Sequence, residues 1–231
     1  MCGRYNVIDD PYTRELLAVL GIQNALDTRY NIAPTENVQV VSQDDSGTQL
    51  SCMRWWLVPA WVKEPGTQYS MFNARAEGLS ESRAFRHPFK SQRCIIPASS
   101  FIEWRSEDGK QPYDIRSVKG ALAFAGLWDC WGSGAERIYS CAMITTDAVP
   151  EFRHIHSRMP VMLAPDMFQQ WLDPAIDGKT LMPFLLPQLP APLQVVAVDP
   201  RINNSRFKEA PEPIATMEMI VANLTDRHSR Q

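Results

Sequence analysis

The chain has 231 residues, of which 45% are hydrophobic and 21% are charged, a composition typical of a globular protein with a sizeable core. Its formal net charge of −3 excludes a protein that coats nucleic acid through an overall positive field. Its apolar runs are far shorter than the ~20 residues of a membrane helix, and the first residues lack the apolar core of a signal peptide. We therefore expect a cytoplasmic protein without a membrane span.

The predicted elements of the first half are one helix and several short strands. Residues 13–20 carry apolar side chains at helical spacing between Pro11 and Gly21, which predicts an amphipathic helix. The pair Asp108-Gly109 lies between residues 101–103 and 113–115 and predicts a β-hairpin, with Glu103 on its first strand. Other runs rich in branched or aromatic residues predict strands over 38–42, 50–56, 93–96, 121–127, 138–145 and 193–198.

The second half adds a helix and an irregular connection. Pro165 opens a helical stretch through residues 167–172, and four prolines between 183 and 192 predict an extended connection. The composition shows no break, so we expect one domain over residues 1–222 and a disordered tail over 223–231. Many strands and few helices predict an α+β fold, built on curled antiparallel β-sheets with a barrel-like core and a few flanking helices.

Cys2 is a candidate nucleophile because of its position. Removal of Met1, normal before a small residue, would leave Cys2 exposed at the terminus with a free α-amine beside its thiol. An amine with a pKa of ~8 and a thiol with a pKa of ~8.5 both react near neutral pH. The amine can form a Schiff base with an aldehyde, and the thiol can then close a thiazolidine ring. Alternatively the thiolate attacks an acyl carbon, or the cysteine stands there by chance.

Acidic and imidazole side chains supply candidate proton-transfer groups. Glu103 is flanked by apolar residues that would raise its pKa and suit it to proton transfer, although an exposed glutamate on a strand is the plain alternative. His154 and His156 are one residue apart and on a strand would face the same side. One interpretation is an acid/base histidine beside a structural one, and another is a pair of structural histidines. Two metal ligands are a less favoured interpretation.

Polar, basic and aromatic residues offer weaker signals for nucleic acid. Asn73 can donate and accept hydrogen bonds, and Arg75 can grip a phosphate. Residues 75–93 hold five basic side chains against two acidic ones, which fits a local anion site and equally a solvated face. Tryptophans such as Trp61 stack on bases or pack in the core. The five cysteines include no C-x-x-C pair, and no motif implies a cofactor or a metal.

Six ordered segments together resemble the SOS response-associated peptidase (SRAP) domain family. The resemblance runs from Cys2 to Leu163 and more loosely through VDPRINN at 198–204. The chain departs from the family at Trp56, where glycine is usual, and at Ser99-Ser100, where Asp-Gly is usual, and these departures concern the loop near the DNA groove. The segments are MCGRY (1–5), RYNIAPT (29–35), WWLVPAW (55–61), NARAE (73–77), RCIIPASSFIEW (93–104) and HSRMPVML (156–163).

The resemblance implies a protein that recognises abasic sites in single-stranded DNA and forms a DNA-protein crosslink through Cys2, protecting the lesion in the DNA damage response. By position, Glu103 would be the general acid/base at the sugar, and His156 would assist imine formation and crosslink reversal. Asn73 would hold the amine and the sugar oxygens. The resemblance places the DNA contacts at Arg4, Arg75, Trp61, Trp104 and Thr145.

Two other functions remain open from the residues. In a cysteine peptidase, Cys2 would attack an acyl carbon, and such an enzyme would need an oxyanion hole. In a non-covalent reader of single-stranded or modified DNA, arginines and tryptophans would bind without any covalent step. We expect single-stranded DNA with an abasic site as the partner, no metal or cofactor, and a monomer.

Overall fold

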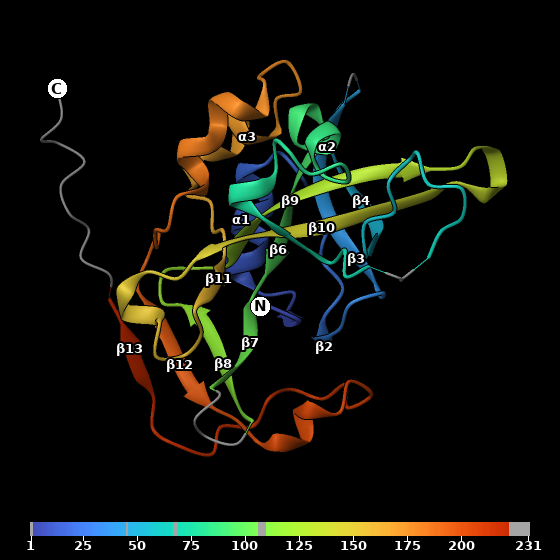
Figure 1. Cartoon of the computed structure of the whole chain (residues 1–231). Coiled ribbons are helices and arrows are strands. Elements are labelled where there is room, and N and C mark those ends of the chain that lie inside the picture. The colour runs from blue at the N-terminus through green and yellow to red at the C-terminus, as the bar shows by residue number, and fades with distance from the viewer. Residues whose placement is uncertain (1, 45, 67–68, 106–109, 222–231) are drawn as a thin grey trace, which may run out of the picture.

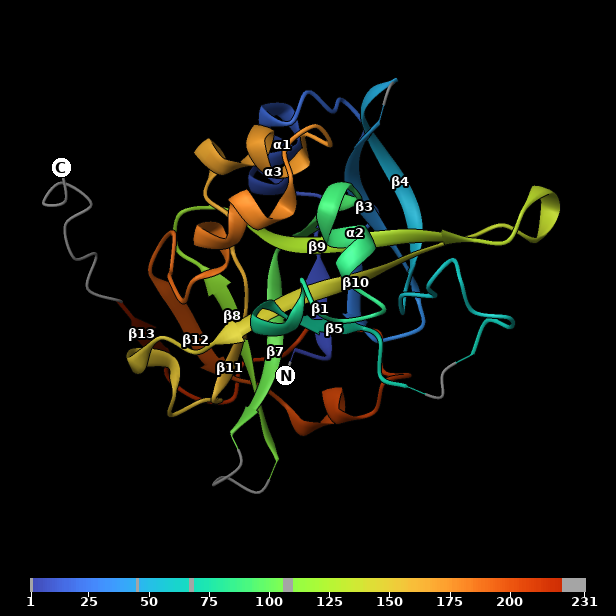
Figure 2. The same cartoon turned by 45° about the horizontal axis from the view of Figure 1, so that its top comes forward.

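The computed structural model describes residues 2–44, 46–66, 69–105 and 110–221. Met1, the Asp108-Gly109 turn and the expected tail lie outside the described residues. The strands form two sheets (Figures 1 and 2). The first sheet has the order β13-β12-β8-β7-β1-β2. Its strands are β1 (Arg4–Val7), β2 (Arg29–Ile32), β7 (Ser100–Arg105), β8 (Gln111–Ser117), β12 (Leu193–Ala197) and β13 (Glu218–Ile220).

The second sheet has the order β11-β10-β4-β3-β6-β9, and β5 also pairs with β10. Strand β10 runs parallel to β4 and β5 and antiparallel to β9 and β11, so this sheet is mixed. Its strands are β3 (Asn37–Asp44), β4 (Gly47–Trp55), β5 (Asn73–Arg75), β6 (Arg93–Ala98), β9 (Leu122–Trp131), β10 (Ile138–Asp147) and β11 (Arg158–Pro160).

Short helices flank the sheets. None of them, within the described ranges, is long and apolar enough to cross a membrane. The α-helices are α1 (Pro11–Val19), α2 (Arg86–Ser91) and α3 (Phe168–Leu172). The 3₁₀ helices are η1 (Ala76–Gly78), η3 (Gly134–Glu136), η4 (Pro150–Phe152), η5 (Pro165–Met167), η6 (Gly178–Leu185) and η7 (Pro200–Asn203).

The core lies between the two sheets. Tyr5 of β1 packs edge-on against Trp55 of β4, with ring centroids 5.1 Å apart, and Phe101 of β7 packs edge-on against Phe124 of β9 at 5.8 Å. Such aromatic pairs contribute stability beyond the area they bury. The predicted α+β fold of curled sheets in one domain is confirmed, and the second sheet curls around this core until its last strand, β9, pairs with β10.

Most predicted elements are confirmed, and the hairpin is among them. Phe101 pairs with Ile115 and Glu103 with Tyr113 across β7 and β8. The extended connection predicted from the prolines is wrong over residues 178–185, which form η6. Its first turn is capped by the Asp177 side chain, which accepts from the backbone N–H of Lys179 at 2.9 Å.

The position of Arg93 shows that the five basic residues of 75–93 do not all lie on one basic face. Its guanidinium is buried and takes no part in a surface patch. Because all of its nitrogens donate to backbone carbonyls, the buried charge is satisfied without a carboxylate partner. These bonds join the end of α2 to α3 and to the segment that follows α3. The acceptors are the carbonyl oxygens of Phe89, Lys90, Trp171, Asp173 and Ile176.

Candidate functional site

The antiparallel pairing of β1 with β7 brings Cys2 close to Glu103. Arg4 pairs with Ile102 and Tyr5 with Phe101, and Cys2 directly precedes this ladder. The Cys2 side chain is fully buried, with its sulfur 3.6 Å from the carbonyl oxygen of Arg4. The thiol is thus sheltered in the core and not exposed as the sequence suggested.

Asn73 reaches the same place from the other sheet. It is the first residue of β5 and lies opposite Met143 in the parallel pairing with β10. Its Nδ2 donates to the carbonyl oxygen of Cys2 at 2.8 Å. Its Oδ1 is buried and, among the described residues, accepts no hydrogen bond. The amide therefore fixes the Cys2 backbone and keeps an acceptor available for an incoming N–H or O–H.

Burial raises the pKa of both Glu103 and Cys2. Glu103 is 3% exposed, and desolvation raises the pKa of its carboxyl, while the positive amino terminus acts in the opposite direction. Burial, and then the negative charge of Glu103, raise the pKa of the Cys2 thiol far above its ordinary value. At neutral pH the thiol is protonated, and a carboxyl with a raised pKa can both donate and accept a proton.

His156 follows η4 in the loop before β11, so residues 154–156 do not form the strand on which His154 and His156 would face the same side. Its Nδ1 accepts from the backbone N–H of Arg158 at 2.9 Å, so the neutral ring carries its proton on Nε2. Partial burial and the positive charges of the amino terminus and Arg158 lower the pKa of His156. His154 instead pairs with Glu218 of β13 at 2.7 Å. The side chains of the two histidines thus contact different parts of the chain.

Arg158 ties the segment of His156 to that of Arg75. Its guanidinium contacts both carboxylate oxygens of Glu77, at 2.9 and 3.0 Å, and Asp147 at 2.8 Å. It also donates to the carbonyl oxygen of Thr145 at 2.7 Å. Thr145 is buried in β10 beside Arg75 of β5, whose side chain is exposed.

Arg4 and Trp104 form a second group at the ends of β1 and β7. The Arg4 guanidinium carbon lies 6.0 Å from the centre of the Trp104 ring, and Nη1 donates to the carbonyl oxygen of Gly3 at 2.9 Å. The indole N–H of Trp104 donates to Oδ1 of Asn203 in η7 at 2.6 Å. The late segment VDPRINN thus supports the wall of the site beside Cys2.

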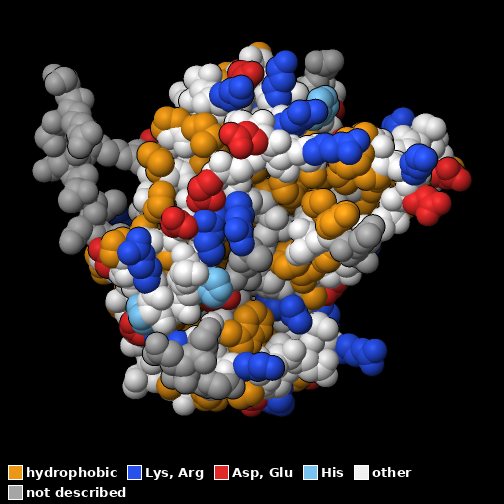
Figure 3. Space-filling view, in the orientation of Figure 1, with side chains coloured by type: hydrophobic (Ala, Val, Ile, Leu, Met, Phe, Trp, Pro, Cys, Tyr) orange, Lys and Arg blue, Asp and Glu red, His pale blue; other side chains and the backbone are white. Residues whose placement is uncertain are grey.

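Trp61 lies in the segment between β4 and β5. It is 50% exposed, and the guanidinium carbon of Arg83 lies 3.9 Å from its ring centre. Figure 3 shows a broad hydrophobic area over this segment, with basic side chains at its edges, next to where Figure 1 places the amino terminus. Aromatic and basic groups side by side suit an unpaired nucleic-acid strand.

The structure thus brings Cys2, Asn73 and Glu103 together, whereas the other predicted residues lie on several separate segments. Sequence reasoning missed Arg158 and Asn203 as contributors and included Arg83 only as one of the five basic residues of 75–93. Arg158 and Asn203 lay within the quoted segments HSRMPVML and VDPRINN, but nothing in those letters showed which partners they would meet.

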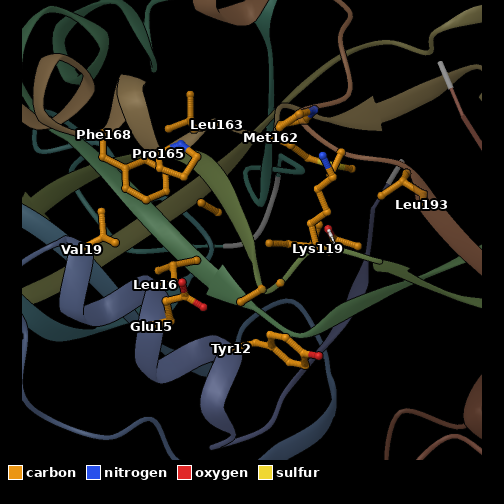
Figure 4. A pocket seen from close by; sticks show the side chains of 17 residues that line it. Tyr12, Glu15, Leu16, Val19, Lys119, Met162, Leu163, Pro165, Phe168 and Leu193 are labelled. Carbon is orange, nitrogen blue, oxygen red and sulfur yellow. Dashed lines mark hydrogen bonds between the residues drawn. The ribbon is translucent and has the colours of Figure 1, made fainter. Parts of the chain in front are cut away.

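A pocket of about 270 Å³ opens elsewhere, between α1, the turn before β9, and the start of α3 (Figure 4). Leu16, Leu122, Phe168 and Leu193 contribute to its apolar wall, and Glu15 and Lys119 are among its polar lining. None of the candidate site residues lines it. Cys2, Asn73 and Glu103 therefore lie outside this pocket.

Comparisons with known proteins agree on one family. Residues 1–205 match the family described as SOS response associated peptidase (SRAP). The abasic site processing protein YoaM of Bacillus subtilis is 37% identical over 218 residues, covering 91% of this chain and 96% of YoaM. The abasic site processing protein HMCES of Xenopus tropicalis is 34% identical over 178 residues, covering 62% of this chain and 53% of HMCES.

A crystal structure of a protein from Bordetella bronchiseptica shares the fold. It superposes with a TM-score of 0.74 at 26% identity, covering 86% of this chain and 100% of that one.

Proposed function

The chain belongs to the SOS response associated peptidase family, and we propose that it recognises abasic sites in single-stranded DNA and captures them covalently through Cys2 once Met1 is removed. The observation that carries this proposal is the hydrogen bond from Asn73 to the Cys2 carbonyl at 2.8 Å, with Glu103 close enough to raise the pKa of the thiol. The name that YoaM and HMCES share, abasic site processing protein, supports the choice of substrate.

The proposed reaction has three steps. The abasic sugar opens from its hemiacetal to an aldehyde, which requires a proton to leave the hydroxyl and another to reach the ring oxygen. The α-amine of Cys2 then attacks the aldehyde carbon, and one water leaves to give an imine. Finally the sulfur of Cys2 bonds to the imine carbon while its proton passes to the imine nitrogen. The product is a thiazolidine that retains every other atom of both partners.

The electrostatics of the site assign an order to the two nucleophiles. Because burial and the charge of Glu103 raise the pKa of the thiol, the amine attacks first and the thiol adds after losing its proton. Glu103, with a raised pKa, serves as the acid and base for ring opening and receives the thiol proton. Neutral His156 can donate from Nε2, which suits it to protonating the leaving oxygen and to reversal of the crosslink.

The surrounding residues would hold the DNA strand. Arg4 and Arg75 would contact phosphates beside the lesion, and Trp61 and Trp104 would pack against the strand or the sugar. Thr145 is buried and held by Arg158, so a contact from its side chain to the backbone of DNA would require Arg158 to shift. A monomer in the cytoplasm, bound to the nucleoid at lesions, would shield the abasic site from cleavage during the damage response.

A peptidase in which Cys2 attacks an acyl carbon is the second candidate, and the family description favours it by name. Thiolate attack needs a thiol pKa near or below neutrality, whereas burial raises the pKa of this one. A non-covalent reader would keep its full binding without Cys2. We therefore rank both below the crosslinking reaction.

A denaturing gel separates these candidates. Protein with a verified free Cys2 terminus, mixed with a single-stranded oligonucleotide carrying one abasic site, should give a slower band without borohydride. Cys2→Ala should abolish the band and leave salt-sensitive binding largely intact, because phosphate contacts do not involve the thiol. An absent band for the unmodified protein would refute the proposal, and an undiminished band for Cys2→Ala would exclude Cys2 as the attachment point.

A further inference from the structure

The segment that carries Trp61 is held at alternate residues by side chains of the β9–β10 hairpin. Figures 1 and 2 both show this segment running beside the hairpin. The segment is not held as a paired strand, because each of the three hydrogen bonds that join it to the hairpin uses a side chain of the hairpin. The bonds are Val58 N–H to Ser140 Oγ (2.8 Å), Ala60 N–H to Asp129 Oδ2 (2.9 Å) and Trp131 Nε1–H to the Val62 carbonyl (2.8 Å).

Asp129 is the charged member of this set. It is 4% exposed, and within the described part of the chain no cation pairs with it. Its oxygens accept from two backbone N–H groups, that of Ala60 and that of Cys130 at 2.8 Å. A buried carboxylate is costly unless hydrogen bonds satisfy it, and bonds to an ionised acceptor are about twice as strong as neutral ones. The bond to Ala60 is therefore a strong anchor for the segment.

Trp61 lies between the two anchored residues Ala60 and Val62. Its indole is half exposed and stacks with the guanidinium of Arg83 at 3.9 Å. A ring that projects from a fixed backbone loses little conformational freedom when a base stacks on it, whereas a ring on a mobile loop must first be ordered. The strength of the hydrogen bond between Asp129 and Ala60 thus affects how much binding free energy Trp61 contributes.

We propose that Asp129 is a positioning residue for nucleic-acid binding, which fixes the backbone at Ala60 so that Trp61 and Arg83 present a preformed stacking surface to an unpaired base. Ser140 and Trp131 support the same segment on either side. The inference rests on the proposed function in taking single-stranded nucleic acid as the ligand. It assigns Asp129 no part in the covalent steps at Cys2.

A double-mutant cycle in the Cys2→Ala protein tests this. The probe is a fluorescent single-stranded oligonucleotide with a tetrahydrofuran abasic analogue, which lacks an aldehyde, and the readout is anisotropy. Trp61→Ala should weaken binding about tenfold, as loss of one stacked base does. Asp129→Ala should weaken it several-fold, and the Trp61→Ala/Asp129→Ala double variant should bind no more weakly than Trp61→Ala alone.

Two control variants separate the loss of the hydrogen bond from the loss of negative charge. Glu136→Ala removes an exposed acid at the tip of the same hairpin and should leave binding unchanged or slightly tighter, because less negative charge favours DNA. Asp129→Asn keeps one oxygen acceptor for the Ala60 N–H but loses the charge and turns its NH2 toward the Cys130 N–H, so it should restore only part of the affinity. Additive losses in the double variant, or unchanged binding by Asp129→Ala, would overturn the inference.

The rate of crosslinking separates this inference from the proposed function. With native Cys2 and a true abasic strand at saturating concentration, Asp129→Ala should react at the unaltered rate and show only a higher half-saturation concentration. A reduced saturating rate would contradict a role limited to binding. If no protein crosslinks at all, the proposed function fails, while the anisotropy cycle still decides the role of Asp129.

Discussion

Cys2 and Glu103 interact through their charges as well as their positions. Each is buried, and the carboxylate charge of Glu103 adds to the desolvation that keeps the thiol protonated. A thiol held neutral is protected from oxidation and alkylation, since the thiolate is the reactive form. It becomes nucleophilic only when a neighbouring base accepts its proton. In the proposed reaction, Glu103 would therefore restrain the thiol at rest and activate it by accepting its proton.

Glu103→Gln tests whether the carboxyl of Glu103 transfers protons in the proposed reaction. The amide keeps the size of the side chain but can neither donate an acidic proton nor accept the thiol proton. We expect crosslink formation to slow by about a hundredfold or more, the usual contribution of general acid–base catalysis. Single-turnover rates measured on denaturing gels would show this, and an unchanged rate would remove Glu103 from the chemistry.

The same substitution, Glu103→Gln, should stabilise the fold although it slows the reaction. A carboxyl whose pKa is raised on folding contributes stability that is complete below its ordinary pKa of 4.5 and is lost as pH rises through the folded value. Glutamine does not ionise, so Glu103→Gln should gain stability relative to the unmodified protein as pH rises from 4.5 through the folded pKa of Glu103. Each unit of pKa shift corresponds to ~1.4 kcal/mol, measurable by urea unfolding. A difference that stays constant with pH would contradict the raised pKa.

At the scale of elements, the site depends on strands from both sheets. β1 and β7 position Cys2 and Glu103, whereas β5 and β10 position Asn73. The β-hairpin of β7 and β8 could be predicted from local turn chemistry, but β1 and β5 could not. They are short, and only long-range pairing stabilises them.

The contact between α2 and η6 gives an element-scale prediction. Gly178 begins η6 directly against α2, and a Cβ there would lie 2.0 Å from the carbonyl oxygen of Phe89, which also accepts from Arg93. Gly178→Ala should therefore lower the free energy of unfolding by about 1–3 kcal/mol or more through overpacking.

Gly66→Ala is the matched control, because a Cβ at Gly66 meets no atom within 4 Å. It should leave the free energy of unfolding within about 0.5 kcal/mol of the original value or raise it slightly. Chemical denaturation of both variants provides the comparison. Equal stability of the two would show that α2 and η6 can separate without cost.

For the whole molecule, the sequence supports the fold class, and the choice of Cys2 as the candidate nucleophile, better than the arrangement of the site. Alternating and branched runs predict most of the strands because sheet formation follows local pattern. The burial of Cys2, the buried guanidinium of Arg93 and the link from Arg158 to Glu77 arise where distant segments meet. No local pattern encodes such contacts, so the protonation state of the thiol could be derived only from the folded structure.

The central claim is that both the amine and the sulfur of Cys2 end in one covalent product with an abasic site. Intact mass spectrometry of the adduct after denaturation and iodoacetamide treatment tests it most directly. We predict the mass of the protein without Met1 plus the oligonucleotide minus one water, with four of the five cysteines alkylated because the Cys2 sulfur lies in the ring. An adduct that retains Met1, or one in which all five cysteines are alkylated, would contradict the account.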